Sequence, residues 1–195
     1  MTSAFNVRAR HGARLAAVLM LAACAPADST PDAAYGMGRT PDATTLAAMD
    51  RDVDPRGHGL PDGEGNVQQG AAVYAAQCAS CHGARGEGIS PSPALVGTKP
   101  AAGHVFARDN KAPRTIGNYW PYATTVFDYV QRAMPLTAPG TLSANDTYSV
   151  VAYLLHENGI VPAAAVMNAT TLPAVRMPAT RFFVRDDRTG GRVFR

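Results

Sequence analysis

The sequence predicts an all-α fold in which a helical domain lies between an extended N-terminal arm and a C-terminal tail. Apolar residues recur at helical spacing within residues 67–77 and 143–159, and residues that start or stop helices bound both segments. Proline and glycine punctuate the sequence on both sides of the domain. A length of 195 residues favours one such domain with appendages. We place the arm at residues 35–65, the domain at residues 66–160 and the tail, a C-terminal extension, at residues 161–195.

The first 23 residues have the organisation of an export signal. Arg8, Arg10 and Arg14 form its charged beginning, and residues 15–23 form an apolar run that is too short to span a bilayer. Because the run ends in Leu-Ala-Ala-Cys, it resembles the lipobox of bacterial lipoproteins. We therefore predict a lipoprotein signal peptide (1–23) and a lipid on the thiol of Cys24. An ordinary signal peptide followed by a free cysteine is the alternative.

A lipidated Cys24 would make the mature protein a membrane-anchored lipoprotein on the periplasmic side of a bacterial cell. Residues 24–34 are small and polar, which predicts a flexible lipidated tether. Loss of the three arginines of the signal reduces the 18 basic residues to 15, equal to the 15 acidic residues. We expect no nucleic-acid partner, because no basic stripe with interleaved aromatic residues is visible.

The arm has room for one short helix. Thr40 could cap this helix and Pro41 could occupy its first position, with the end near Met49. Glycine, proline and aspartate interrupt the rest of the arm. Its composition therefore fits an ordered segment and a loose linker almost equally well.

The first helix of the domain is predicted at residues 67–77, with Asn66 as its N-terminal cap. Small and apolar residues, including Gly70 and Tyr74, recur at helical spacing along it. Glycine inside a helix costs about 1 kcal/mol relative to alanine, so Gly70 indicates a place where another part of the chain approaches closely. The helix leads directly to Cys78.

The run Cys78-Ala79-Ser80-Cys81-His82 is typical of a site for covalent attachment of haem. Each thiol can add to one vinyl group of the haem, and the adjacent imidazole can bind the iron. A zinc site would need two more ligands at suitable spacing, and a redox dithiol would need a preceding strand and a βαβ pattern, and neither is visible. We predict one covalently attached haem c held by Cys78 and Cys81, with His82 as an axial iron ligand.

The segment after the haem motif predicts a loop that wraps the haem. Glycines at its start allow tight turns, and residues 89–112 show no sustained period, with Leu95 and Val96 as the predicted buried positions. Three other histidines are better explained by surface, hydrogen-bonding or helix-terminus roles than by iron ligation: His58, His104 and His156.

Residues 115–130 form the aromatic centre of the chain. Aromatic rings offer apolar area to a haem, while the polar tips of tyrosine and tryptophan can reach its propionates. For Tyr119, Trp120 and Tyr122 we keep two interpretations open, propionate contact and packing. For Phe127 we expect core packing.

A second helix is predicted at residues 124–133, and it runs into Met134 and Pro135. Proline cannot continue a helix, so Met134 would be presented from a helix end, where its thioether can bind low-spin iron opposite His82. Among the seven methionines, only Met134 lies between the haem motif and the last predicted helix. We therefore predict Met134 as the second axial ligand.

The last helix is predicted to begin after Ser143, with Asp146 completing an approximate capping box, and to end by Gly159. Its apolar face is predicted from Tyr148, Val151, Ala152, Leu154 and Leu155. Beyond it, the proline-broken first half of the tail predicts a strap over the domain surface. The six arginines from Arg176 onward predict a solvated end or a docking patch for an acidic partner.

These elements together resemble the class I cytochromes c over about residues 66–159. In that class a small residue and an aromatic residue four positions later contact the last helix, and Gly70 and Tyr74 match this pair. A closer resemblance is to the cytochrome subunits (SoxD-like) of sulfane and sulfite dehydrogenases of the bacterial sulfur-oxidising (Sox) system. It is carried by TIGNYWPYATT at residues 115–125, RAMP at 132–135, GLP at 59–61 and TLP at 171–173.

The resemblance implies a non-catalytic electron-transfer subunit. A molybdenum-containing sulfur dehydrogenase on another chain would oxidise a sulfite or sulfane substrate, and this haem would pass the electrons to a downstream cytochrome or oxidase. The residues themselves indicate that a His/Met pair fills both axial positions and leaves none for substrate. Two alternatives remain: a membrane-tethered shuttle cytochrome for a terminal oxidase, and a self-sufficient haem enzyme such as a thiosulfate dehydrogenase, in which Met134 would have to dissociate.

Overall fold

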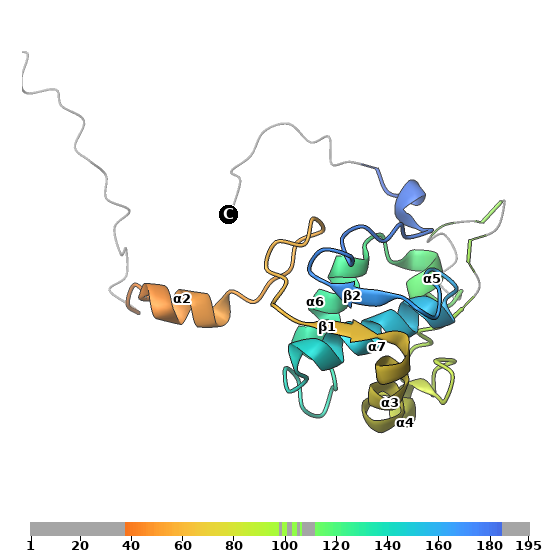
Figure 1. Ribbon diagram of the computed structural model, residues 1–195, viewed down its shortest axis with the longest axis horizontal. Helices are drawn as coiled ribbons and strands as arrows, with labels where there is room; N and C mark the ends of the chain where they lie inside the picture. Colours follow the sequence, from red (N-terminus) through yellow and green to blue (C-terminus); the bar gives the residue numbers. More distant parts are fainter. Residues whose placement is uncertain (1–37, 98, 101–102, 105, 107–111, 185–195) are drawn as a thin grey trace, which may run out of the picture. The chain divides into compact units, whose positions relative to one another are not determined.

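Helix α7 (Ala144–Glu157) is the element on which the others pack. In the computed structural model, which describes residues 38–97, 99–100, 103–104, 106 and 112–184, α7 contacts α3 (Val67–Gln77), α5 (Ile116–Tyr119) and α6 (Ala123–Ala133) (Figure 1). The five residues of the predicted apolar face are buried or nearly so. Burial also extends around the helix to Thr147, Ser149 and Val150, because the strands and the tail cover a further side of it.

A small antiparallel sheet joins the arm to the tail. Strand β1 (Glu64–Asn66) pairs with β2 (Val166–Asn168), and Gly65 lies opposite Met167. A Cβ atom on Gly65 would lie 2.2 Å from the backbone nitrogen of Ser149, so glycine allows β1 to lie directly against α7. The described chain is otherwise helical, which confirms the predicted fold class with this two-stranded addition.

The predicted starts and stops of α3 and α7 are confirmed. Asn66 Oδ1 accepts a hydrogen bond of 2.9 Å from the N–H of Gln69, and Gln69 Oε1 accepts one of 3.2 Å from the N–H of Asn66. Ser143 Oγ accepts from the N–H of Asp146 at 3.1 Å. Gly159 follows α7 with a φ of +62°, a left-handed conformation that suits glycine at a helix end.

Helices α3 and α7 meet at Gly70. A Cβ atom there would lie 1.9 Å from the carbonyl oxygen of Ser149. One turn later the buried ring of Tyr74 lies 5.1 Å from the ring of Tyr153, centroid to centroid. The contact that the class I resemblance implied for Gly70 and Tyr74 is therefore present.

The chain forms two units, Met1–Ala43 and Thr44–Arg195, and α2 (Ala43–Met49) lies at their junction. The arm helix begins at Ala43, and the predicted start at Pro41 is wrong by two residues. A difference of this size is common at helix ends, where the first N–H groups have no intrahelical partner. The predictions for Cys24, for the signal peptide and for the lipidated tether lie outside the described residues.

From Val53 onward the arm packs against the domain as an ordered segment rather than a loose linker. The side chain of Val53 is buried in the core, and the hydroxyl of Tyr148 donates to the carbonyl of Pro61 at 2.9 Å. Buried backbone groups that bond in this way fix the path of the chain.

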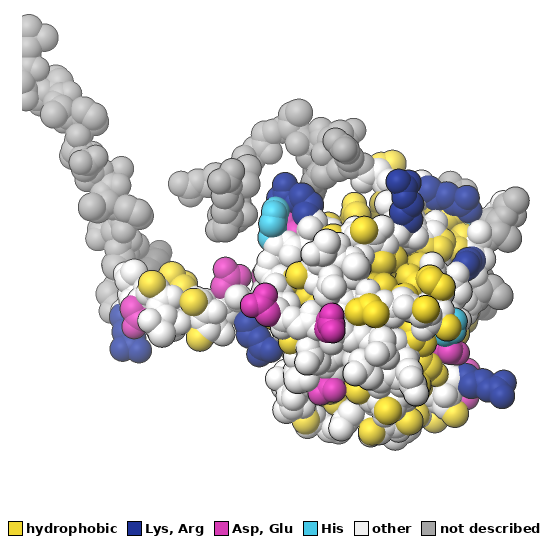
Figure 2. Space-filling model, viewed as in Figure 1, with side chains coloured by type: hydrophobic (Ala, Val, Ile, Leu, Met, Phe, Trp, Pro, Cys, Tyr) yellow, Lys and Arg dark blue, Asp and Glu magenta, His cyan; other side chains and the backbone are white. Residues whose placement is uncertain are grey.

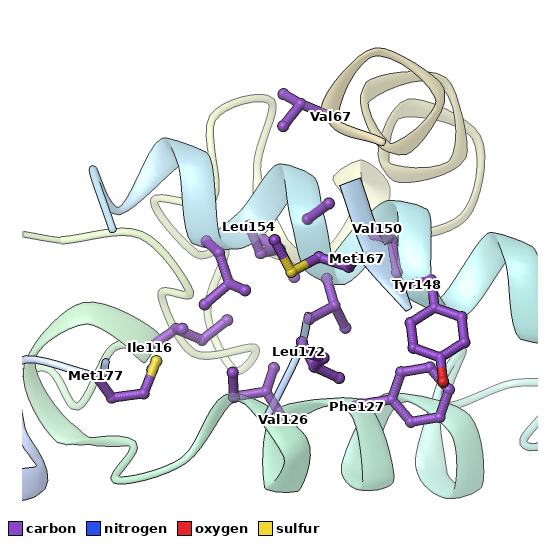
Figure 3. Packing of buried hydrophobic residues seen from close by; sticks show 14 of the residues in the cluster. Val67, Ile116, Val126, Phe127, Tyr148, Val150, Leu154, Met167, Leu172 and Met177 are labelled. Carbon is purple, nitrogen blue, oxygen red and sulfur yellow. The ribbon is translucent and has the colours of Figure 1, made fainter. Parts of the chain in front are cut away.

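The tail supplies part of the hydrophobic core. The predicted strap over the domain surface therefore describes the tail incompletely. Met167, Leu172 and Met177 are buried among residues of α5, α6 and α7 (Figure 3). A short 3-10 helix, η2 (Thr180–Phe182), follows. In the part of the chain that the structure describes, no helix has the length and apolar character needed to cross a membrane.

Candidate haem site

The haem motif occupies a single helical turn at the end of α3. Cys78 ends α3 and precedes α4 (Ala79–His82), and its carbonyl accepts hydrogen bonds from the N–H groups of Cys81 and His82 at 3.1 and 2.9 Å. Side chains three residues apart on a helical turn lie on neighbouring positions of its surface. Both thiols are free, with Cys78 half-buried and Cys81 exposed. The two sulfurs are therefore available to one planar group beside this turn.

The imidazole of His82 is oriented by its inner nitrogen. Nδ1 lies 2.8 Å from the carbonyl oxygen of Pro93, so in the tautomer with a proton on Nδ1 the ring donates to that oxygen. An iron-binding histidine is usually oriented by such a hydrogen bond through its other nitrogen. Nε2 is then left available for the predicted bond to the iron.

The loop after the motif is tied back to it by hydrogen bonds. The N–H groups of Gly88 and Ile89 donate to the carbonyls of His82 and Cys81 at 2.7 and 3.1 Å. Gly83 has a φ of +83°, and a Cβ atom on it would lie 2.5 Å from the carboxyl carbon of Glu87. Backbone N–H groups, led by that of Glu87 itself, lower the pKa of this carboxyl group. The sharp exit from the haem turn thus depends on a glycine.

The surroundings of the Cys78 thiol do not resemble those of a redox cysteine. Burial, with a smaller effect of Cys81, raises the pKa of Cys78 to about 11. Redox-active cysteines react as the thiolate, which a lowered pKa favours. Among the described residues no group of three or more histidine, cysteine, aspartate or glutamate side chains is placed to hold a metal ion. Neither alternative interpretation gains support.

Met134 stands at the end of α6, as predicted from the sequence. Its N–H donates to the carbonyl of Val130 at 3.1 Å, and its backbone is extended, with φ of −119° and ψ of 153°. The side chain is half-buried. The pairing of Met134 with His82 across the iron stays a prediction.

The three aromatic residues for which propionate contact and packing are both possible lie in different surroundings. Tyr119 stacks on Phe106 with ring centroids 5.3 Å apart, and the guanidinium of Arg114 lies 5.1 Å from its ring centroid. The half-buried Trp120 meets Tyr129 edge to face at 5.7 Å. Tyr122 is exposed. Packing is thus observed for Tyr119 and Trp120, while propionate contact stays a prediction for all three.

The other histidines have different partners. Nδ1 of His58 lies 2.9 Å from Asp54, and Nδ1 of His156 lies 3.1 Å from the carbonyl of Val161. The ring of His104 packs on Phe182, with centroids 5.5 Å apart. These contacts agree with the prediction that their roles are structural.

Asn158 is a buried residue that is not among the site residues predicted from the sequence. Its Oδ1 accepts from the N–H groups of Gly97 and Gly117 at 3.2 and 3.0 Å, and its Nδ2 donates to the carbonyls of Leu95 and Leu154 at 3.1 and 2.8 Å. One side chain thereby joins the loop behind His82 to α5 and to the end of α7. An asparagine directly before the helix-ending glycine was the available signal.

A polar pocket of about 460 Å³ lies elsewhere. It is lined by Asp50, Asp52, Val53, Asp54, His58, Gly59, Asp128 and Arg132. None of the predicted haem residues lines it, so it is not the haem site.

The residues of the haem motif fit a covalently bound haem. Two free thiols lie one turn apart, and the following imidazole is held through Nδ1, which leaves Nε2 for the predicted bond to iron. Large apolar side chains are exposed within seven residues of a predicted ligand: Ile89 at 51%, Tyr129 at 49% and Leu136 at 76%. Figure 2 shows apolar side chains gathered on one part of the face in view. Exposed apolar area of this kind marks a surface that another group covers.

Comparison with known proteins gives the same class. Residues 65–154 match the family described as cytochrome C oxidase, cbb3-type, subunit III. The fold, this match and the attachment motif define a class I c-type cytochrome that carries one covalently bound haem c.

Among solved structures, the sulfane dehydrogenase SoxCD from Paracoccus pantotrophus contains a chain that is 40% identical, with a TM-score of 0.68. The alignment covers 79% of this chain and 73% of that one. The chain therefore belongs to the family of SoxD-like cytochrome subunits.

Two thiosulfate dehydrogenases show partial similarity. The enzyme of Stutzerimonas stutzeri (strain A1501) is 32% identical over 95 residues, which are 48% of this chain and 28% of that protein. The chain thus spans less than a third of this curated relative. The structure of thiosulfate dehydrogenase (TsdBA) from Marichromatium purpuratum is 26% identical over 70% of this chain and 24% of that one, with a TM-score of 0.32.

Proposed function

We propose that this cytochrome is the electron-transfer subunit of a sulfur-compound dehydrogenase. A molybdenum-containing partner on another chain oxidises a sulfite or sulfane substrate and delivers electrons singly to the haem of this chain. A downstream cytochrome or oxidase then receives them. The substrate is bound by the partner, and this chain supplies the relay.

The extent of the likeness to the SoxCD chain carries this proposal. The cytochrome family match covers residues 65–154, whereas the SoxCD alignment covers 79% of the chain. The likeness therefore continues outside the haem domain, into segments that electron transfer by an isolated cytochrome does not require. A partner-specific role of the arm and tail explains why these segments resemble those of a dehydrogenase subunit.

The site itself suits a relay better than catalysis. The haem supplies a reversible one-electron change at its iron. Cys78 and Cys81 would fix the haem to the chain, and His82 and Met134 would occupy both axial positions, so no position remains for substrate. The Pro93 carbonyl holds the imidazole of His82 in one orientation, which would favour His82 as a permanent ligand of the iron.

The same proposal includes a place in the cell. A lipid on Cys24 would anchor the mature protein on the periplasmic side of the membrane, through the tether at residues 24–34. Fatty-acid labelling of the parent and of Cys24→Ala tests this part separately. Label on the parent alone is expected, and equal labelling of both would contradict the anchor.

A self-sufficient thiosulfate dehydrogenase is the second candidate, because 95 residues resemble such an enzyme at 32% identity. In that case the iron of this chain would meet substrate directly, and Met134 would have to leave it. The likeness covers 28% of that enzyme, so it gives weaker support than the likeness to the SoxCD chain.

Reduction of the haem by substrate distinguishes the two candidates. The purified ferric holoprotein is mixed with sulfite or thiosulfate, alone and after addition of the proteins that co-purify with it from native membranes. We expect no reduction by the chain alone, rapid reduction with the co-purified fraction, and a molybdopterin protein in that fraction. Reduction by thiosulfate without any partner would favour the second candidate. No molybdopterin protein and no reduction in either mixture would contradict the dehydrogenase role.

A further inference from the structure

The position of Met134 depends on how α6 is held, because Met134 directly ends this helix. On the core side, Phe127 is fully buried and its ring centroid lies 4.5 Å from that of Tyr148. On the other side, the exposed Arg132 forms an ion pair with Asp52 of the arm at 3.5 Å. Two residues of α6 that are more buried, Thr124 and Asp128, each form a hydrogen bond to the arm. These two bonds connect the arm to the helix that presents the predicted iron ligand.

Asp128 forms the stronger of the two connections. Its Oδ1 accepts from the backbone N–H of Val53 and from Nε of Arg132, both at 2.9 Å, and its Oδ2 accepts from a terminal nitrogen of Arg132 at 2.5 Å. The side chain of Asp128 is only 15% exposed. Its hydrogen bond raises the pKa of Arg132, which lies two residues before Met134. One carboxylate thus ties the arm to the last turn of α6.

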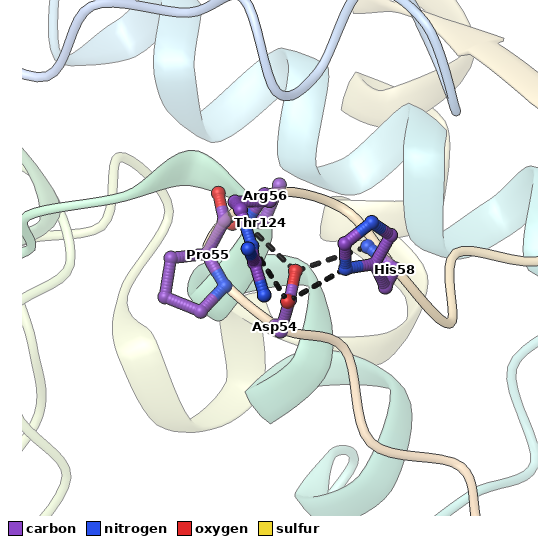
Figure 4. A network of polar contacts seen from close by, with 5 residues as sticks. All are labelled: Asp54, Pro55, Arg56, His58 and Thr124. Carbon is purple, nitrogen blue, oxygen red and sulfur yellow. Dashed lines mark hydrogen bonds and ion pairs between the residues drawn. The ribbon is translucent and has the colours of Figure 1, made fainter.

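Thr124 forms the second connection, one turn earlier on the same helix. Its hydroxyl donates to the carbonyl of Pro55 at 3.1 Å (Figure 4). That carbonyl is held in place by the turn around Asp54, whose carboxylate accepts from the N–H groups of Arg56 and His58 and from the side chains of both. These bonds lower the pKa of Asp54 to about 2. The arm therefore presents a closed turn, rather than a free strand, to α6.

We propose that residues 53–55 of the arm brace α6, and that Asp128 and Thr124 are positioning residues that keep Met134 on the haem iron. This inference rests on Met134 being an axial ligand. Release of Met134 requires the end of α6 or the following loop to move, and a helix that is hydrogen-bonded to the arm at two positions four residues apart resists that movement. Hydrogen bonds to a carboxylate are about twice as strong as neutral ones, so Asp128 contributes more than Thr124.

The rate at which imidazole replaces Met134 tests the brace. Ferric holoprotein is mixed with saturating imidazole, and loss of the long-wavelength iron–thioether absorption band is followed in a stopped-flow instrument. At saturation this rate equals the rate at which Met134 leaves the iron. We expect it to rise about tenfold in Asp128→Ala, which corresponds to ~1.4 kcal/mol, and about threefold in Thr124→Val. Haem content should equal that of the parent in both variants.

Asp146→Asn is the matched control. Asp146 is a carboxylate in the first turn of α7, and its side chain bonds to Ser143 rather than to α6 or the arm. Its loss should lower the free energy of unfolding without changing the rate of imidazole binding. A control that accelerated imidazole binding as much as Asp128→Ala would show that general destabilisation suffices, and would overturn the brace.

Rates within twofold of the parent in both brace variants would also overturn it. If Asp128→Ala yielded no holoprotein, Thr124→Val alone would decide, since it removes one hydroxyl and keeps the shape of the side chain. A parent without the thioether band would overturn the inference at its first step. That result would not contradict the proposed dehydrogenase partnership, because the reduction experiment tests the partnership and does not depend on Met134.

Discussion

The hydroxyl of Tyr74 donates a hydrogen bond of 2.7 Å to the carbonyl of Gly83. Tyr74 lies on α3, before the haem turn, and Gly83 is the first residue after it. The bond therefore closes the segment that carries both thiols and His82, and both of its ends are buried. The helix that packs on α7 and the turn that holds the haem are joined by this contact.

Tyr74→Phe should leave the Gly83 carbonyl without its partner. A buried acceptor that loses its donor costs about 1–3 kcal/mol, and we expect the free energy of unfolding of the holoprotein in urea to fall by that amount. Haem attachment should persist, because the thiols are untouched. A loss below about 0.3 kcal/mol would mean that the bond contributes little in solution.

The buried tyrosines predict a loss of stability at high pH. Burial raises the pKa of Tyr74 and of Tyr148 from 10.0 to about 12. Unfolded chains therefore lose these protons first, and stability falls as pH rises from 10 to about 12, by about 1.4 kcal/mol per pH unit for each tyrosine. Denaturant titrations across this range should show a shallower fall in Tyr148→Phe than in the parent. An identical slope in both proteins would contradict the prediction.

Gly70→Ala should destabilise the protein although alanine is the better helix former. The gain in helix propensity is about 1 kcal/mol. The new Cβ atom would lie 1.9 Å from the carbonyl oxygen of Ser149, which is backbone and can move only if α3 and α7 separate. We expect a net loss of about 1–3 kcal/mol in urea unfolding. Ala71→Val, at the exposed neighbouring position, is the control and should stay within about 0.5 kcal/mol.

Asn158→Asp should separate the donor role of this side chain from its acceptor role. The aspartate can still accept from Gly97 and Gly117, but it faces the carbonyls of Leu95 and Leu154 without a donor. We expect a loss of about 3 kcal/mol in unfolding free energy at neutral pH. Asn145→Asp, near the start of α7 where negative charge is favourable, should cost under about 1 kcal/mol. Equal costs at the two positions would show that burial of Asn158 is not the cause.

Local hydrogen bonding explains which parts of the fold could be predicted from the sequence. The start of α3 depends on Asn66 and Gln69, and that of α7 on Ser143 and Asp146, pairs only three residues apart. The haem motif is equally local, since the two thiols and the imidazole lie within five consecutive residues. Such features depend on short stretches of sequence, so they can be predicted without knowledge of the tertiary structure.

The features that were missed depend on residues far apart in the chain. Strands β1 and β2 have three residues each, too few to show a period, and their partners are about a hundred residues apart. The four bonds of Asn158 reach residues in three segments, and the bond from Val53 to Asp128 spans 75 positions. No local pattern encodes these contacts. The tail was likewise underestimated, because Met167, Leu172 and Met177 become core residues only through their place in the fold.

The absorption spectrum of the ferric mature protein tests the central claim, a haem held by Cys78 and Cys81 and ligated by His82 and Met134. We predict a low-spin spectrum with the weak long-wavelength iron–thioether band, and we expect Met134→Ala to lose this band while the haem stays attached. Met167→Leu and Met177→Leu change buried core methionines and should keep the band. A colourless protein, a high-spin parent, or a band that survives in Met134→Ala would contradict the account.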